Sequence, residues 1–445
     1  MRTVILGAAG RDFHDFLVLY RDDPYWEIVA FTATQIPYID DRRFPAALAG
    51  PRYPKGIPIV PEDGLEELVA REQVECCVFA YSDVSNDYVA RMAARVNALG
   101  CDFVLPGTRA MISGTKPILS ICAVRTGCGK SQASRYVLEK LRDRGIKAVG
   151  IRHPMPYGDL ERQAVQRFAT REDLAKHECT VEEREEYEPY IEHGHVVYAG
   201  VDYVAILRQA EAEADVILWD GGNNDLPFLR PDLHIVLDDP HRPGDGLRYY
   251  PSEAQLRLAD VIFIAKAQTA PEAAVEAERK LCRTVNPTAK ILPVASVLKL
   301  DGASGLTEAD LTHKRVVCVE DGPTTTHGGM RYGAATLLAQ RAGATIVDPR
   351  PFLVGELAAT FVKYPALGPL IPAMGYSAKQ IADLEASINA MDVDYVISGT
   401  PIALEKLVTA KVPILRVRYD LAELDGEIPI DRILDTFLAK VQVAI

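Results

Sequence analysis

Val124-Arg125-Thr126-Gly127-Cys128-Gly129-Lys130-Ser131 stands between an apolar run at 117–123 and a helical pattern at 132–144. A strand, a glycine-bearing turn ending in Gly-Lys-Ser and a helix form a cradle whose turn amides and helix N-terminus face an anion. In such a loop the lysine adds a positive charge and the serine hydroxyl reaches Mg²⁺. The stretch predicts a nucleotide-phosphate site with Lys130 as a catalytic residue. Its further nucleotide contacts are expected to be Thr126, Gly127, Cys128, Gly129, Ser131 and Gln132.

One position departs from the usual G-x-x-x-x-G-K-[ST] spacing, because Val124 replaces the first glycine. The alternative is a plain strand-to-helix turn. The same residues also fit a deviant loop, K-G-G-x-G-K-[ST], in which the first lysine reaches the nucleotide, often from a partner subunit. Arg125 stands in that lysine's place and has a planar fork for phosphate oxygens, so we predict a catalytic role for it. The alternative for Arg125 is a side chain that points into solvent.

The totals suit a globular protein of several domains. A chain of 445 residues is expected to form two to four domains. The formal net charge of −13 argues against general nucleic-acid binding, which needs a basic surface. The eight cysteines show no C-x-x-C spacing of a zinc site, so we expect most of them to be buried. Since the apolar runs are too short for a signal peptide or a membrane span, we expect a cytoplasmic protein with no membrane partner.

Short β-rich apolar runs alternate with helical patterns along the chain, which predicts an α/β fold with parallel sheets. Residues 1–114 form the first block, a Rossmann-like domain with strands expected at 3–6, 27–33, 76–81 and 103–105. Its Gly7-x-x-Gly10 is only half of the dinucleotide fingerprint, and no acidic residue ends the second strand. We therefore expect a plain scaffold, or a small-anion site beside Arg11, in preference to a dinucleotide site.

Residues 115–299 form the second block, a P-loop NTPase core. Its apolar strand at 215–220 ends in Asp220, and Mg²⁺ is a hard cation that takes carboxylate oxygens. Asp220 is therefore predicted to act in catalysis and to hold Mg²⁺ together with Ser131; the alternative is a simple strand-end turn. An insertion at about 153–214 is too long for a simple connection and is a candidate lid or substrate-binding element. Its charged run at 182–186 is expected to be a solvated helix face.

Residues 300–445 form the third block, an α/β region that is either a separate domain or an extension of the central sheet. Loops that follow apolar strands in the last two blocks carry several cationic and polar side chains. Together they predict a pocket for more negative charge than a nucleotide alone carries. The predicted substrate-binding residues are Arg152, His153, Asn223, Asn224, Arg242, His327 and Arg331, and Lys266 is predicted to contact the nucleotide.

These motifs resemble those of a known family, cyclic 2,3-diphosphoglycerate synthetase and its bacterial relatives, many of which are described as predicted GTPases. The resemblance covers nearly the whole chain. Its most distinctive runs are Trp-Asp-Gly-Gly-Asn-Asn-Asp at 219–225 and Thr-His-Gly-Gly-Met at 326–330. Other stretches that carry it are 7–16, 125–131, 152–159, 179–189, 199–203, 239–244 and 249–251.

The resemblance implies an ATP-dependent ring closure of 2,3-diphosphoglycerate, catalysed by a homodimer, that yields a cyclic phosphoanhydride, ADP and phosphate. Because the attacking groups are already anions, this chemistry needs charge neutralisation and in-line positioning more than a general base. The resemblance places Lys130 on the β- and γ-phosphates, Ser131 and Asp220 on Mg²⁺, and Arg125 on the transferring group. The residues expected to bind the phosphates and carboxylate of the substrate are Arg152, His153, Arg242 and Arg331.

Two departures bear on the nucleotide and the substrate. Ala265-Lys266-Ala267-Gln268 lacks the aspartate of the Asn-Lys-x-Asp element that selects guanine, which removes the physical basis for preferring GTP. Gly244-Asp245-Gly246 stands where relatives are expected to carry His-Glu. One alternative is therefore another phosphorylated acid as substrate. A second is a regulatory NTPase or metallochaperone-like switch, for which His193 and His195 are the nearest ligand pair.

Overall fold

The computed structural model describes residues 1–8, 10–34, 42–153, 158–301, 305–326, 330–373 and 377–443. It is a mixed α/β protein with large sheets that are mostly parallel, as the alternation of apolar runs and helical patterns predicts. The chain forms two compact units. The first holds residues 1–178, 193–294 and 423–445, and the second holds residues 179–192 and 295–422. The boundaries expected at 114 and 299 stay predictions.

The N-terminal part of the first unit is a six-stranded sheet in the order β3-β4-β2-β1-β5-β7. Its neighbouring strands are parallel except for the antiparallel pair β3–β4. The strands are β1 Arg2–Leu6, β2 Glu27–Ala33, β3 Arg43–Phe44, β4 Ile57–Pro61, β5 Cys76–Phe79 and β7 Asp102–Val104.

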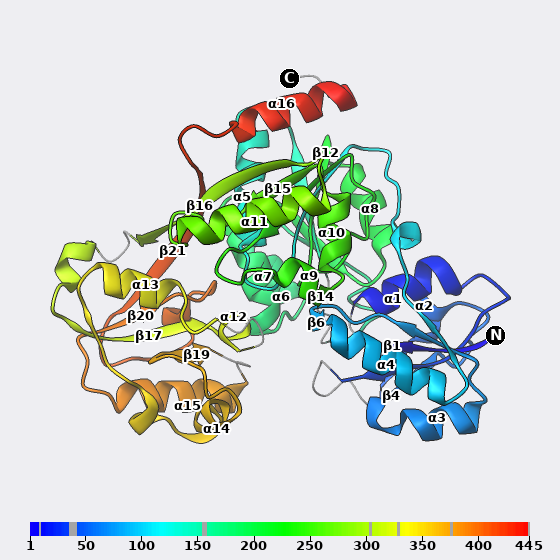
Figure 1. Ribbon diagram of the computed structural model, residues 1–445. Coiled ribbons are helices and arrows are strands. Elements are labelled where there is room, and N and C mark those ends of the chain that lie inside the picture. Colours follow the sequence, from blue (N-terminus) through cyan, green and yellow to red (C-terminus); the bar gives the residue numbers. More distant parts are fainter. Residues whose placement is uncertain are drawn as a thin grey trace. The chain divides into compact units, whose positions relative to one another are not determined.

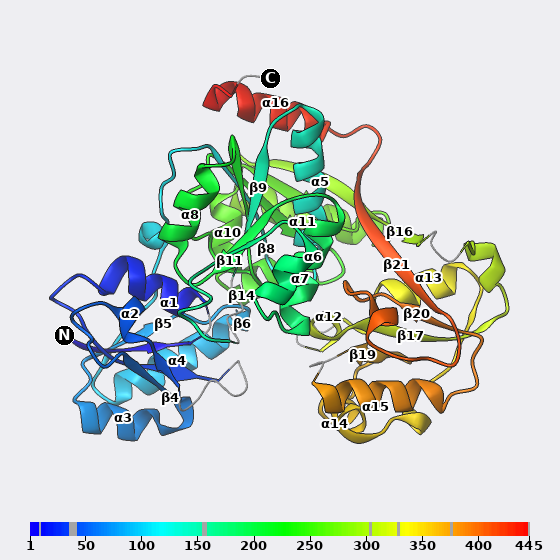
Figure 2. The same ribbon diagram turned by 180° about the vertical axis from the view of Figure 1, so that it is seen from behind.

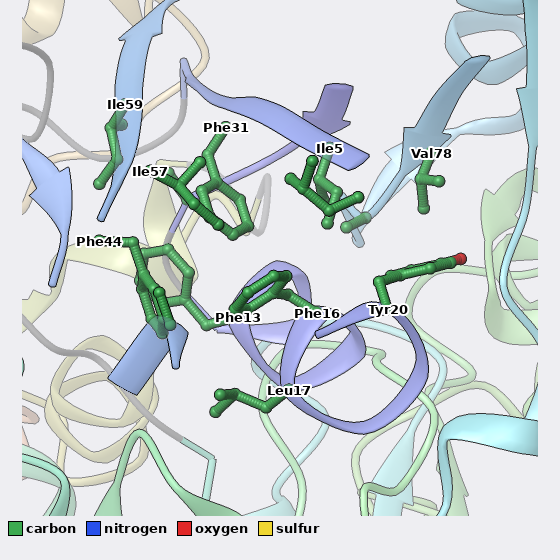
Figure 3. Packing of buried hydrophobic residues seen from close by; sticks show 14 of the residues in the cluster. Ile5, Phe13, Phe16, Leu17, Tyr20, Phe31, Phe44, Ile57, Ile59 and Val78 are labelled. Carbon is green, nitrogen blue, oxygen red and sulfur yellow. The ribbon is translucent and has the colours of Figure 1, made fainter. Parts of the chain in front are cut away.

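Helices cover both faces of this sheet because successive residues of each strand point to opposite sides. On one face, Ile5 packs with the residues of α1 Arg11–Asp15, its π-helical continuation η1 Phe16–Tyr20 and α2 Ala46–Ala49. Figure 3 shows the aromatic rings of this face, including Phe13 and Phe44, whose centroids lie 4.8 Å apart. On the other face, α3 Leu65–Glu72 and α4 Asn86–Ala98 pack against Val4 and Leu6 (Figure 1).

The second sheet of the first unit carries the predicted phosphate loop. Its strands follow the order β10-β11-β9-β12-β8-β13-β15-β16, with parallel pairing except between β10 and β11. Their bounds are β8 Ile118–Ala123, β9 Ala148–Arg152, β10 Val165–Phe168, β11 Val197–Gly200, β12 Val216–Asp220, β13 Leu233–Asp238, β15 Val261–Ile264 and β16 Lys290–Leu300.

The helices of this sheet begin with α5 Lys130–Asp143, directly after the loop that follows β8. On one face α8 Tyr203–Glu211 packs over Trp219 and Phe228, which are fully buried (Figure 2). The short antiparallel pair β6 Val84–Ser85 and β14 Tyr249–Tyr250 joins the N-terminal part to the core of the unit. The other helices are α6 Arg171–Lys176, α9 Asp245–Arg248, α10 Ser252–Leu258, α11 Glu272–Val285 and α16 Ile430–Val441.

The second unit is built on parallel strands in the order β21-β20-β17-β18, and β19 also pairs with β17. The chain leaves the first unit within β16 and returns to it at the end of β21. The strands are β17 Arg315–Asp321, β18 Thr345–Ile346, β19 Ile371–Ala373, β20 Tyr395–Ser398 and β21 Ile414–Glu423. The helices are α7 Val181–Glu192, α12 Gly322–Thr325, α13 Ala334–Arg341, α14 Gly355–Lys363 and α15 Ala378–Asn389.

The solvated face expected for the charged run at 182–186 is wrong. Within α7, Glu183, Tyr187, Glu188 and Tyr190 are all buried, and every described side chain of this helix is at least partly covered. The cysteine prediction is confirmed, because all eight thiols are free and buried. Within the described ranges, none of the helices has the length and apolar character needed to cross a membrane.

Candidate active site around the phosphate loop

The predicted strand, loop and helix are present. Val124 extends β8 beyond its last residue, since its buried main-chain N–H donates to Leu237 O at 2.9 Å. The turn follows later, at Gly127 and Gly129, whose φ angles of +80° and +106° lie in the left-handed region that favours glycine. A Cβ at Gly129 would also meet the side-chain nitrogen of Gln132, which would have to move away.

Lys130 begins α5 and points back across the loop that follows β12. Its side chain is buried, and Nζ donates to Asn223 O at 2.6 Å. Burial, and after it the charge of Arg152, lower the pKa of Lys130. The Asn223 side chain accepts a hydrogen bond from Thr126 Oγ1 at 2.9 Å. Three predicted site residues, Thr126, Lys130 and Asn223, are therefore brought together.

Asp220 ends β12, which pairs directly with the phosphate-loop strand β8. The carboxylate is completely buried, and its Oδ2 forms an ion pair with Arg152 Nη1 at 2.8 Å. Arg152 also donates to Gly221 O at 3.2 Å, while its own carbonyl accepts from Tyr203 OH at 2.8 Å. Arg152 is thus bound to the residue predicted to hold Mg²⁺.

The donors available to Mg²⁺ are the Ser131 hydroxyl, in the first turn of α5, and the Asp220 carboxylate. No group of three or more His, Cys, Asp or Glu side chains that could hold a metal ion occurs in the part of the chain that the structure describes. A hydroxyl and a carboxylate nevertheless fit Mg²⁺ bound to a nucleotide, because phosphate oxygens and water supply most of its ligands.

Lys266 and Arg242 hold the phosphate loop by its carbonyl groups. Lys266 Nζ donates to Gly127 O at 2.7 Å, and Arg242 Nη1 donates to Thr126 O at 2.8 Å. Both side chains also pair with the buried carboxylate of Asp239, at 2.8 and 3.2 Å. Burial alone would raise the pKa of Asp239, but Lys266 and Arg242 lower it. These two cationic side chains therefore stabilise the loop by hydrogen bonds to its main-chain carbonyl groups.

Arg125 is buried, so the alternative of a solvent-exposed side chain is wrong. Its guanidinium group lies between two carboxylates, with Nε bonded to Asp83 at 2.5 Å and Nη1 to Asp245 at 2.6 Å. The same group lies over the ring of Tyr249, 3.5 Å from its centroid. A catalytic role for Arg125 remains a prediction, and it would require the guanidinium group to loosen one of these contacts.

His153 and Asn224 are held by residues of the surrounding framework. The His153 Nε2 lies 3.0 Å from Asp225 Oδ2, and Arg11 Nε donates to the other oxygen of that carboxylate at 2.7 Å. The anion beside Arg11 is thus the protein's own Asp225. Asn224 is completely buried; its amide donates to Ser252 Oγ at 2.7 Å, and its oxygen accepts from the main-chain N–H of Asp83 at 2.6 Å.

The two remaining predicted substrate-binding residues are His327 and Arg331. His327 falls outside the described residues. Arg331 belongs to the second unit, where its side chain is exposed and its carbonyl accepts from Gly368 N at 3.1 Å. The residues that the sequence did not single out are carboxylates and one ring, namely Asp83, Asp225, Asp239, Asp245 and Tyr249. Asp225 and Asp239 belong to the sequence runs 219–225 and 239–244, which carry the family resemblance. Asp83 lies 43 positions before Thr126, and no local sequence pattern marks it as a site residue.

Comparison with known proteins identifies one close relative. No protein-family model matches the chain. The arginine synthetase ArcE of Thermococcus kodakarensis is 54% identical over 425 residues, which cover 95% of this chain and 94% of that protein.

Solved structures give weaker likenesses. LpxK from Aquifex aeolicus in complex with ATP has a TM-score of 0.46 at 10% identity and covers 85% of this chain and 99% of that chain. A DUF1611 family protein from Anabaena variabilis has a TM-score of 0.21 at 12% identity and covers 66% of this chain and 94% of that chain. At such scores neither likeness bears on what this chain does. Because the identity with arginine synthetase ArcE extends over nearly the whole of both chains, this chain belongs to the family of arginine synthetase ArcE.

Proposed function

We propose that this protein is an ATP-dependent ligase that makes arginine. The observation that carries the proposal is a 54% identical relative named arginine synthetase, matched over 95% of a chain that also has a formed phosphate loop. In that loop Lys130 is positioned by Asn223 O, and its ammonium group supplies the positive charge that nucleotide phosphates need. Cytoplasmic localisation and a homodimer remain predictions.

The chemistry of making a guanidinium group explains the need for ATP. The carbon of a ureido group still carries an oxygen, and this oxygen leaves only after it has been activated. In the proposed reaction the oxygen attacks the γ-phosphorus of ATP, and ADP leaves. Ammonia then adds to the same carbon, and phosphate departs with the electrons of the C–O bond. A proton is lost from the incoming nitrogen. Positioning and charge neutralisation supply most of the catalysis in the phosphoryl transfer.

Five charged residues of the site, together with Ser131, have a role in this scheme. Lys130 binds the β- and γ-phosphates, and Ser131 and Asp220 would hold Mg²⁺, which neutralises phosphate charge when bound. Lys266 and Arg242 keep the loop in shape through its carbonyl groups. Arg152, which is paired with Asp220, would contact the transferring phosphoryl group in this scheme.

The second candidate is closure of the cyclic phosphoanhydride of 2,3-diphosphoglycerate. The gathering of Lys130, Arg152, Arg242 and Lys266 near one loop favours this more anionic substrate. The ion pairs favour arginine instead, because Arg152 pairs with Asp220 while Arg242 and Lys266 pair with Asp239. A pocket whose cations already face buried carboxylates suits a substrate of low net charge better than one with several phosphates. We therefore place arginine synthesis first.

One assay separates the two candidates. The purified full chain is incubated with MgATP and either citrulline plus ammonium chloride or 2,3-diphosphoglycerate. Citrulline carries a ureido group where arginine carries its guanidinium group. Arginine, measured by mass spectrometry and matched by equal ADP and phosphate, would support the first candidate. A cyclic product in ³¹P NMR spectra, without arginine, would transfer the assignment to the second. If ADP release depends on neither substrate, both candidates fail.

A further inference from the structure

A separate group of polar side chains lies at the carboxyl edge of the N-terminal sheet. Thr32 stands near the end of β2, Glu62 directly follows β4, Tyr81 follows β5, and Tyr88 lies in the first turn of α4. We call these four residues the Glu62 cluster. In the strand order β3-β4-β2-β1-β5-β7, the strands that follow β1 in the chain are added first on one side of it and then on the other, so the sheet has a topological switch point beside β1. Open α/β sheets bind ligands at the carboxyl ends of the strands at such a point.

The Glu62 carboxylate is the centre of the cluster and is only 4% exposed. One oxygen, Oε2, accepts from Tyr81 OH at 2.7 Å and from Thr32 Oγ1 at 3.2 Å. Among the described residues, the other oxygen, Oε1, has one long contact, of 3.4 Å, with Tyr88 OH. An ionised carboxylate can accept about four hydrogen bonds, so Oε1 retains room for a further donor.

No positively charged side chain among the described residues forms an ion pair with Glu62. Arg95 donates to the main-chain carbonyl of Glu62 at 3.5 Å, and its pKa is raised mainly by its hydrogen bonds to Glu66 and more weakly by the charge of Glu62. However, both ends of its guanidinium fork bind Glu66, at 2.7 Å each. A carboxylate removed from water without a cationic partner is unfavourable, whereas a cationic ligand would compensate it.

The aromatic members of the cluster suit such a ligand. Burial, followed by the charge of Glu62, raises the pKa of Tyr88 to about 12, and the same two causes raise the pKa of Tyr81 well above its usual value. Both phenols therefore keep their protons at neutral pH and remain hydrogen-bond donors to the carboxylate. A tyrosine ring also attracts a positive charge that lies over its face. Tyr88 is 37% exposed and gives the cluster an opening to solvent.

The Glu62 cluster is joined by a short stretch of chain to the phosphate loop. Two residues beyond Tyr81 stands Asp83, which accepts from Thr126 Oγ1 at 2.6 Å and binds Arg125. A ligand held against Tyr81 would therefore lie on the segment that fastens the loop carrying Lys130.

We propose that the Glu62 cluster binds the positively charged nitrogen group, ammonium or guanidinium, of a small ligand. The carboxylate accepts the N–H donors through Oε1, and the tyrosine rings cover the cation. The choice of an amino acid as the ligand rests on the proposed function, while the charge of the group follows from the cluster itself.

The test measures binding without nucleotide by isothermal titration of the full chain. Three probes separate the sources of charge: L-arginine, Nα-acetyl-L-arginine, which keeps only the guanidinium group, and L-citrulline, which keeps only the α-ammonium group. We expect arginine and one of the other two probes to bind, and Glu62→Gln to weaken that binding about tenfold or more, as loss of a charge-assisted hydrogen bond does. Glu67→Gln removes an equal charge from an exposed neighbour and should bind like the unmodified protein.

Two further considerations separate an effect on binding from an effect on folding, and this proposal from the proposed function. Because Glu62→Gln removes a buried charge and keeps the shape, its melting temperature without ligand should be equal or higher. The proposal is overturned if no probe binds, if Glu62→Gln binds as well as the unmodified protein, or if that variant weakens only ATP. Since the titration requires no turnover, Glu62-dependent binding in a protein that forms no arginine would leave this site standing and sink only the proposed function.

Discussion

Asp83, beyond the carboxyl end of β5, accepts hydrogen bonds from both the main-chain N–H and the hydroxyl group of Thr126, at 3.1 and 2.6 Å. Its other oxygen binds Arg125. A residue of the N-terminal sheet thus fixes two consecutive residues of the phosphate loop. The N-terminal part of the first unit is therefore a structural component of the predicted nucleotide site.

Arg125→Ala should destabilise the protein by about 3 kcal/mol, because it removes the cation that binds the largely buried carboxylates of Asp83 and Asp245 most closely. Denaturant unfolding of the variant and the parent protein gives this difference. Arg142→Ala, which removes an exposed arginine from α5, serves as the control and should change stability by less than about 0.5 kcal/mol. Equal stability of Arg125→Ala and the parent would show that the ion pairs of Arg125 with Asp83 and Asp245 do not stabilise the fold. Size-exclusion chromatography of the same samples tests whether Arg125 also acts between subunits.

Lys130→Ala should abolish nucleotide-dependent turnover and leave the fold intact, because the ammonium group binds phosphate and supports only one main-chain carbonyl, that of Asn223. Loss of such a charge in a phosphate site costs at least about two orders of magnitude in rate. ADP release under saturating ATP gives the rate, and circular dichroism checks the fold. Lys147→Ala, at an exposed position, should keep full activity. Retained turnover in Lys130→Ala would contradict the proposal that Lys130 binds the phosphates of the nucleotide.

Val124→Gly restores the first glycine of the usual loop spacing and should nevertheless be harmful. The Val124 side chain is completely buried, and its N–H and C=O both form hydrogen bonds, to Leu237 O and from Ser252 Oγ. Removing the side chain and loosening the backbone should lower the free energy of unfolding by about 2 kcal/mol or more. ATP affinity, measured by titration, should not improve. Tighter binding of ATP by Val124→Gly would show that Val124 limits the affinity of the loop for the nucleotide.

Asp15→Asn should change how stability depends on pH. Burial raises the pKa of the Asp15 carboxyl group from 3.8 to about 7, although Arg11 opposes it. Between these values the folded state holds a proton that the unfolded chain has released. The stability supplied by this protonation is therefore present below about pH 4 and is lost as the pH rises through 7.

The asparagine variant cannot lose that proton. Its free energy of unfolding, relative to the parent, should rise with pH from 4 to 7 by up to about 1.4 kcal/mol per pH unit. Urea unfolding at several pH values measures this difference, with the exposed Asp22→Asn as the matched control. A difference that stays constant with pH would show that Asp15 is ionised in the folded protein.

Local sequence patterns predicted the elements well. Strands occur at the apolar runs expected for β1, β2, β5, β8 and β12, because the side chains of each run are largely buried. The loop around Lys130 and the strand ending in Asp220 were also predicted, since both depend on residues close together in the chain.

The partners of those residues were not predictable in the same way. Asp83, Asp239 and Asp245 reach the phosphate loop through tertiary structure, and no spacing rule connects them with Arg125 or Lys266. The sequence shows the basic residues near the loop but not the carboxylates that face them, so the ion pairs of Arg125, Arg242 and Lys266 were not predicted. The charged run at 182–186 misled for a related reason, since Glu183 and Glu188 are buried by packing that their sequence does not reveal.

The burial of every thiol gives the protein a built-in reporter. Cys128 lies inside the phosphate loop, and its sulfur accepts from Arg242 Nη2 at 3.2 Å. An alkylating reagent can reach this sulfur only when the loop opens, so the rate of its labelling records how often that happens. Slower labelling of the Cys128 peptide in the presence of ATP would locate the nucleotide by mass spectrometry, without any knowledge of the second substrate.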